Sequence, residues 1–165
     1  MAKITLQGNP INTIGELPNL GEQAKDFTLV KADLSRVSLS EFKGSNVILN
    51  IFPSLDTGTC AASVRHFNKV AGENPNTKVL CISRDLPFAQ ARFCGAEGLE
   101  NVITLSDFVD GSFGNDYGLQ VVDGPLAGLN SRVVIILDEN GKIKYTQQVP
   151  EITEEPNYED VMKHL

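Results

Sequence analysis

Three short apolar runs, separated by helix-length segments, place the strongest constraint on the fold of this chain. Asn46 to Phe52 (NVILNIF), Lys78 to Ser83 (KVLCIS) and Val133 to Leu137 (VVIIL) are almost continuously apolar. Such runs are typical of strands buried on both faces of a sheet. Between the first two runs, the segment from Cys60 to about Ala71 repeats apolar residues at helical spacing. The sequence therefore predicts an α/β protein built around a central sheet.

Weaker signals complete the order of elements. A short helix is expected from Asp85, an N-cap-type residue before Pro87, to about Cys94, where Gly95 should stop it. Strand, helix, strand, helix, a closing hairpin and a last helix is the order of the thioredoxin-like fold, although doubly wound folds share its first half. This fold has a central mixed β-sheet flanked by helices. The remaining predicted elements are an N-terminal β-hairpin around Gly8-Asn9-Pro10, strands at Phe27 to Val30, Val102 to Leu105 and Ile143 to Val149, one helical turn at Ser40 to Gly44, and a helix from Tyr158.

Length and charge limit the classes of function. The 165 residues contain no repeat, low-complexity tract or linker, so a single domain spanning residues 1–165 is expected. The net charge of −7 argues against nucleic acid or an anionic membrane as a partner, because both need a basic surface. No run approaches the roughly 18 apolar residues of a membrane span, and the N-terminus lacks an apolar signal region. The expected compartment is the cytoplasm.

Cys60 is the strongest candidate for chemistry. It follows a buried strand, Pro53 and the turn Thr57-Gly58-Thr59, and it opens a predicted helix. The free N–H groups and positive dipole end of a helix N-terminus favour the thiolate, which is the nucleophilic form of cysteine. Position alone also permits an inert buried cysteine at a helix start.

The other two cysteines are less informative by position. Cys81 lies inside an apolar strand, where a free cysteine behaves as a small hydrophobic residue. Cys94 in the last turn of its predicted helix could equally react or only pack. The separations of 21 and 13 residues between successive cysteines do not fit a zinc site. Thr57 stands where a Cys-x-x-Cys motif would have its first cysteine, which disfavours a general dithiol oxidoreductase.

The two histidines do not support a cysteine–histidine hydrolase. His66 follows Cys60 by six residues, which places the two about 240° apart around a helix. We therefore expect His66 at the surface. His164 belongs to the terminal helix and is expected to be solvated.

Three motifs together resemble one family. The pattern Pro-x-x-x-Thr-x-x-Cys, from Pro53 to Cys60, resembles the active-site motif of the peroxiredoxins. The wider string NIFPSLDTGTCAASVRHFN is similar to the atypical two-cysteine thiol peroxidases in particular. DLPFAQARFCGAEG (Asp85 to Gly98) and GPLAGLNSRVVIILDENGKI (Gly124 to Ile143) extend the resemblance over nearly the whole chain.

The resemblance implies a role for each matching position. Cys60 would be the peroxidatic cysteine, and Cys94 the resolving cysteine that forms a disulfide with it. Thr57 would orient the thiolate and the peroxide, and Pro53 would shield the thiolate from bulk water. Arg132 would stabilise the charge that develops on the leaving oxygen, as a preorganised donor.

The same resemblance implies an activity and partners. A thiol-dependent peroxidase would reduce hydrogen peroxide and organic hydroperoxides, with thioredoxin as its reductant. It would need no cofactor, neither metal, haem nor flavin, and would form a homodimer. Two other functional hypotheses remain open. One is a redox sensor that passes its disulfide to a partner protein, and the other is a redox-inert chaperone on the same fold.

Overall fold

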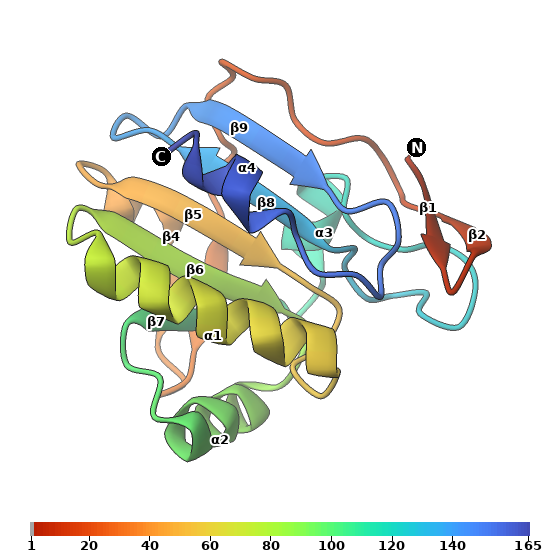
Figure 1. The fold of residues 1–165 in the computed structure, drawn as a ribbon, viewed down its shortest axis with the longest axis horizontal. Helices are drawn as coiled ribbons and strands as arrows, with labels where there is room; N and C mark the ends of the chain where they lie inside the picture. Colours follow the sequence, from red (N-terminus) through yellow and green to blue (C-terminus); the bar gives the residue numbers. More distant parts are fainter. Residues whose placement is uncertain (1) are drawn as a thin grey trace.

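The computed structural model describes residues 2–165 as a seven-stranded mixed sheet with helices on its faces and a separate two-stranded hairpin (Figure 1). The strand order is β4-β3-β7-β6-β5-β8-β9, in which β5, β6 and β7 run parallel and the other neighbours pair antiparallel. The strands are β1 (Lys3–Leu6), β2 (Asn9–Asn12), β3 (Thr28–Lys31), β4 (Arg36–Ser38), β5 (Asn46–Ile51), β6 (Thr77–Ser83), β7 (Val102–Ser106), β8 (Val133–Leu137) and β9 (Ile143–Gln148). The helices are the 3-10 turn η1 (Leu39–Phe42), α1 (Gly58–Glu73), α2 (Pro87–Glu97), α3 (Ser112–Asp116) and α4 (Tyr158–Met162).

The central strand β5 is buried on both faces, as its continuous apolar sequence predicts. Val47, Leu49 and Ile51 pack into one hydrophobic core, whereas Ile48 and Phe52 pack into a second. Side chains alternate across a strand, so one run supplies both cores. The second core lies beneath α1, and the first lies on the opposite face of the sheet.

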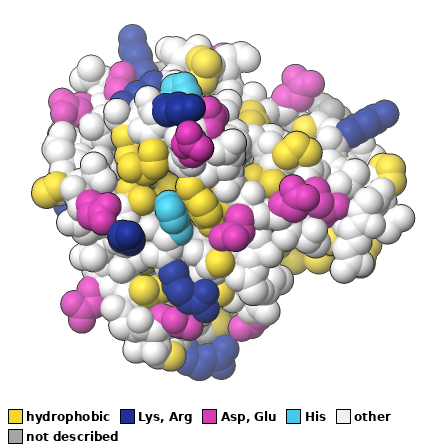
Figure 2. All heavy atoms as spheres, viewed as in Figure 1, with side chains coloured by type: hydrophobic (Ala, Val, Ile, Leu, Met, Phe, Trp, Pro, Cys, Tyr) yellow, Lys and Arg dark blue, Asp and Glu magenta, His cyan; other side chains and the backbone are white. Residues whose placement is uncertain are grey.

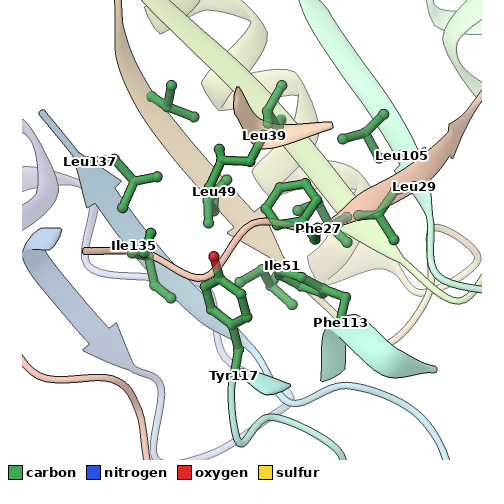
Figure 3. Close-up of a cluster of buried hydrophobic side chains, with 14 of the residues drawn as sticks. Phe27, Leu29, Leu39, Leu49, Ile51, Leu105, Phe113, Tyr117, Ile135 and Leu137 are labelled. Atoms are coloured by element: carbon green, nitrogen blue, oxygen red, sulfur yellow. The ribbon is translucent and has the colours of Figure 1, made fainter. Parts of the chain in front are cut away.

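The first core is held together by aromatic side chains that come from outside the sheet (Figure 3). The rings of Phe27 and Phe113 meet edge to face with their centroids 5.0 Å apart. Tyr117 packs against both rings, and its hydroxyl donates to the Lys25 carbonyl. These contacts place the segment before β3 and the short helix α3 on this face, away from α1.

The N-terminal hairpin is confirmed, but its turn is one step earlier than predicted. Gln7 and Gly8 form the turn with φ values of 51° and 81°, and Leu6 pairs with Asn9. Two-residue hairpin turns need such positive φ values, which glycine adopts at no steric cost. Asn9 and Pro10 therefore belong to β2.

The helix that carries Cys94 also ends later than predicted. Gly95 lies inside α2, which continues to Glu97 and ends at Gly98 in the left-handed conformation with φ 67°. Two glycines were available as stop signals, and Ala96 and Glu97 between them are good helix formers. Asp85 is not the N-cap either: the capping position is Leu86, without a side-chain hydrogen bond.

The surface carries mixed charges. Figure 2 shows acidic and basic side chains interspersed over the face that bears α1 and α4. Within residues 2–165, no helix is long and apolar enough to cross a membrane. A cavity of about 320 Å³ between η1, the start of β5 and the end of β8 lies at the opposite end of β5 from Cys60.

Candidate active site

Cys60 lies in the first turn of α1, just past the end of β5. Its side chain is fully buried, while Thr57 and Gly58 beside it are exposed. Thr57 is the N-cap of α1: its Oγ1 accepts from the Cys60 N–H at 3.4 Å and donates to the Ser54 carbonyl at 3.1 Å. Pro53, two residues beyond the end of β5, is buried. The Cys60 thiol is thus buried, while the residues that begin its helix are exposed to solvent.

Arg132 reaches Cys60 from the neighbouring strand. Val133, at the start of β8, pairs with Ile51 at the end of β5, so Arg132 lies at the sheet edge from which α1 departs. Its Nη2 is 3.3 Å from the Cys60 Sγ. Its Nε donates to the Ile152 carbonyl at 2.9 Å. The structure therefore brings together two residues that are 72 positions apart in the chain.

The guanidinium of Arg132 is unusual for a charged group because it is only 2% exposed. Within residues 2–165 its Nη1 is buried without a hydrogen-bond partner. Leaving a buried donor unpaired is costly, so Nη1 is a donor that a bound ligand could satisfy. The Arg132 guanidinium therefore lies against a sulfur that belongs to the first turn of α1.

Asp85, which the sequence suggested as a helix cap, instead organises the loop before Cys60. Asp85 accepts hydrogen bonds from the Ser54 hydroxyl at 2.7 Å, the Leu55 N–H at 2.8 Å and the Ser83 hydroxyl at 2.6 Å. Asp85 follows β6, the parallel neighbour of β5, and the carboxyl ends of parallel strands meet at one edge. The meeting of parallel strand ends could have placed Asp85 beside this loop from sequence alone. Its residue type and the nearby Pro87 suggested a helix cap instead.

Cys94 is not bonded to Cys60, because all three cysteines are free thiols in this structure. Cys94 is half-buried on α2, and this helix packs against β7 (Figure 1). Burial raises the pKa of the Cys94 thiol, against a smaller opposing effect of the Thr104 side chain on β7. In this state the Cys94 thiol therefore lies against the Thr104 side chain of β7 and is not bonded to Cys60.

Cys81 is fully buried in β6, and the Asn50 side chain contacts its sulfur at 3.8 Å. Burial raises the pKa of the Cys81 thiol to about 12, so it stays protonated and unreactive at neutral pH. We expect Cys81→Ser to keep the full rate of the peroxide reduction that the family resemblance implies. It should lower the free energy of unfolding by about 1–3 kcal/mol, because it buries a hydroxyl. Urea unfolding and a peroxide assay test the two halves, and a several-fold loss of rate would give Cys81 a part in catalysis.

His66 is only partly exposed, so the expectation that it lies at the surface holds in part. Its ring stacks on Tyr158 of α4 with the centroids 3.8 Å apart, and its Nε2 is buried without a partner within residues 2–165. Burial lowers the pKa of His66, which favours the neutral ring. The argument from helical geometry considered only the helix that carries Cys60. It could not reveal that α4 packs against this side of α1. His164 is exposed, as predicted.

Comparison with known proteins agrees with this geometry. The profile of the Redoxin family matches residues 19–162. The thiol peroxidase of Mycobacterium tuberculosis (strain ATCC 25618 / H37Rv) is 54% identical over 165 residues, which cover 100% of this chain and 99% of the relative. The chain belongs to the thiol peroxidases of the redoxin family.

Solved structures of redoxins and their relatives confirm the thioredoxin-like fold. The crystal structure of a peroxiredoxin-like protein from Aquifex aeolicus matches with a TM-score of 0.93 and 36% identity, covering 99% of this chain and 95% of that one. The thiol peroxidase from Chromobacterium violaceum matches with a TM-score of 0.90 over 98% and 93% of the two chains. At 21% identity, this second match supports the fold alone.

Proposed function

We propose that the protein is a thiol-dependent peroxidase that reduces hydrogen peroxide and organic hydroperoxides, with Cys60 as its nucleophile. The observation that carries the proposal is the position of the buried Arg132 guanidinium. It places Nη2 3.3 Å from the Cys60 sulfur and keeps Nη1 free of any protein partner within residues 2–165. One charged group can thus hold the thiolate and still donate to a peroxide oxygen.

In the first step, the Cys60 thiolate attacks one oxygen of the peroxide. A sulfur–oxygen bond forms, the O–O bond breaks, and the departing oxygen leaves as water or an alcohol after taking up a proton. Negative charge grows on that oxygen in the transition state, where the Arg132 donors stabilise it. One such preorganised donor contributes about 3–4 kcal/mol. Thr57 is assigned the second donor role, for which its hydroxyl must turn from the Ser54 carbonyl.

In the second step, the Cys94 thiol condenses with the Cys60 sulfenic acid, which gives a disulfide and water. A thioredoxin-type dithiol then reduces the disulfide and becomes oxidised itself, so two electrons pass from thioredoxin to the peroxide. This cycle suits the cytoplasm, because free thiols persist in a reducing compartment.

We expect α2 to loosen when the disulfide forms. A disulfide needs Cα atoms within roughly 7 Å, whereas Cys94 packs over β7 in the dithiol form. The first turns of α2 are anchored by Gln90, which donates to Ser83 and to the Leu105 carbonyl. A segment of 11 residues is too short to be helical without such packing. Amides from about Leu86 to Glu97 should therefore exchange faster in the disulfide form than in the dithiol form.

Hydrogen exchange of both forms, followed by mass spectrometry, measures this difference. The central strands β5, β6 and β8 serve as the internal control and should barely change. Equal protection of α2 in both forms would show that no unwinding accompanies the bond.

The homodimer remains part of the proposal. Leu86, Phe88, Phe108 and Val109 are large apolar side chains that are more than a third exposed, and two of them border a cavity of about 380 Å³. A second copy of the chain would cover such a surface. Sedimentation at micromolar concentration tests this, and a monomer would contradict it.

Steady-state turnover with a thioredoxin system tests the proposed function directly. Sustained consumption of hydrogen peroxide and of an organic hydroperoxide is the expected result. A redox sensor would lose thiols to stoichiometric peroxide without sustained turnover. A redox-inert chaperone would lose none.

A further inference from the structure

Glu151 is a partly exposed carboxylate that accepts five hydrogen bonds. Its two oxygens accept from the Thr153 N–H at 3.0 Å and hydroxyl at 2.7 Å. They also accept from the Thr5 hydroxyl at 2.9 Å, the Gln7 N–H at 3.1 Å and the Gly8 N–H at 2.8 Å. The Gly8 N–H first, then the two Thr153 groups and the Thr5 hydroxyl, lower the pKa of Glu151 to about 2, so it is a carboxylate at neutral pH.

Three of these five donors belong to the N-terminal hairpin. The turn conformation of Gln7 and Gly8 directs two successive N–H groups at the same carboxylate. Backbone bonds strengthen the attachment: Thr5 N–H donates to the Pro150 carbonyl at 2.8 Å, and Ile152 N–H donates to the Thr5 carbonyl at 2.9 Å. The hairpin therefore holds residues 150–153 in place from one side.

The other side of this segment faces the candidate active site. The Ile152 carbonyl accepts from the Arg132 Nε at 2.9 Å. The Thr153 carbonyl accepts from the Thr59 hydroxyl at 2.8 Å, directly before Cys60. Arg132 has no carboxylate partner in any ion pair found within residues 2–165, so the Ile152 carbonyl is what orients its planar group.

We propose that Glu151 is a positioning residue for peroxide reduction. Its hydrogen bonds to the hairpin fix the Ile152 carbonyl, which in turn aims the Arg132 guanidinium at the reacting sulfur and oxygen. The hairpin is then a working part of the active site. This inference rests on the proposed function. Even a small displacement of the Arg132 guanidinium would matter, because a shift on the order of 1 Å in a catalytic group can cost about 100-fold in rate.

A double-mutant cycle tests the proposal. The rate constant for oxidation of Cys60 by hydrogen peroxide is measured by competition with a second peroxidase of known rate. We expect Glu151→Gln to slow this step about tenfold and Arg132→Met about 100-fold. Because Glu151 acts through Arg132, the double variant should be no slower than Arg132→Met alone. Slowing by the same factor in both backgrounds, as general loosening of the fold would give, overturns the proposal.

Asp123 provides a matched control. This carboxylate also anchors the hairpin, accepting from the Asn12 N–H and side-chain amide, each at 2.8 Å, but its partners do not lead to Arg132. Asp123→Asn should leave the rate within about twofold of wild type. If Glu151→Gln also keeps the wild-type rate, the positioning role is refuted while the proposed function stands. A wild-type protein that does not react with peroxide would instead refute the function, and the positioning role with it.

A milder variant decides the question if Glu151→Gln fails to fold. Thr5→Val removes one hydroxyl donor to Glu151 and keeps the shape of the side chain. We expect it to slow the peroxide step two- to threefold, in order-of-magnitude terms, and to have no effect in the Arg132→Met background. A rate unchanged by Thr5→Val would then overturn the proposal.

Discussion

Replacing Cys60 with serine is expected to abolish peroxide reduction. A serine hydroxyl is un-ionised at neutral pH and is a poor nucleophile, whereas the thiolate is strongly nucleophilic. The variant should still fold, because the serine hydroxyl can take the place of the sulfur as the hydrogen-bond partner of Arg132 Nη2. Peroxide consumption in the presence of a thioredoxin system measures the loss.

Cys81→Ser is the control for this experiment, since it makes the same chemical change at a buried thiol in β6. It should keep wild-type turnover. Residual activity of Cys60→Ser above a few per cent of wild type would mean that another group attacks the peroxide.

Replacing Cys94 with serine should limit the protein to about one equivalent of peroxide. Attack by Cys60 does not need Cys94, so the first oxidation should proceed at the wild-type rate. Without a resolving thiol the sulfenic acid persists, and further peroxide should convert it to sulfinic acid. Cys81 cannot substitute, because its thiol is fully buried with a pKa of about 12. Intact mass after increasing peroxide should show addition of one and then two oxygen atoms.

Sustained turnover of Cys94→Ser with thioredoxin would contradict the assigned role. In that case another thiol, or the reductant itself, would resolve the sulfenic acid, and movement of α2 would no longer be needed.

The apolar runs predicted the core strands well because burial on both faces leaves little freedom of sequence. The run Val133 to Leu137 matches β8 residue for residue, and Lys78 to Ser83 differs from β6 by one residue. The edge strand β4 and the short helix α3 were not predicted. These two elements are short, and unlike the five-residue strand β8 they contain no continuous apolar run that would mark them in the sequence.

The candidate site was only partly accessible from sequence. Helix-start chemistry singled out Cys60, but the pairing with Arg132 spans 72 positions and came from family resemblance, which the 3.3 Å contact now supports. The Ile152 carbonyl could not have been found, because any residue presents a backbone carbonyl. The role of Asp85 and the packing of His66 were missed for one reason. Each residue was considered within its own segment, whereas their partners, Ser54 and Tyr158, come from other elements.

Peptide mapping after reaction with one equivalent of hydrogen peroxide tests the central claim most directly. The reduced protein is treated with peroxide, free thiols are alkylated under denaturing conditions, and the digest is analysed by mass spectrometry. We predict loss of two hydrogen atoms per chain, a disulfide-linked peptide pair containing Cys60 and Cys94, and an alkylated Cys81. Three alkylated cysteines, or a disulfide that includes Cys81 in place of Cys60, would contradict the account.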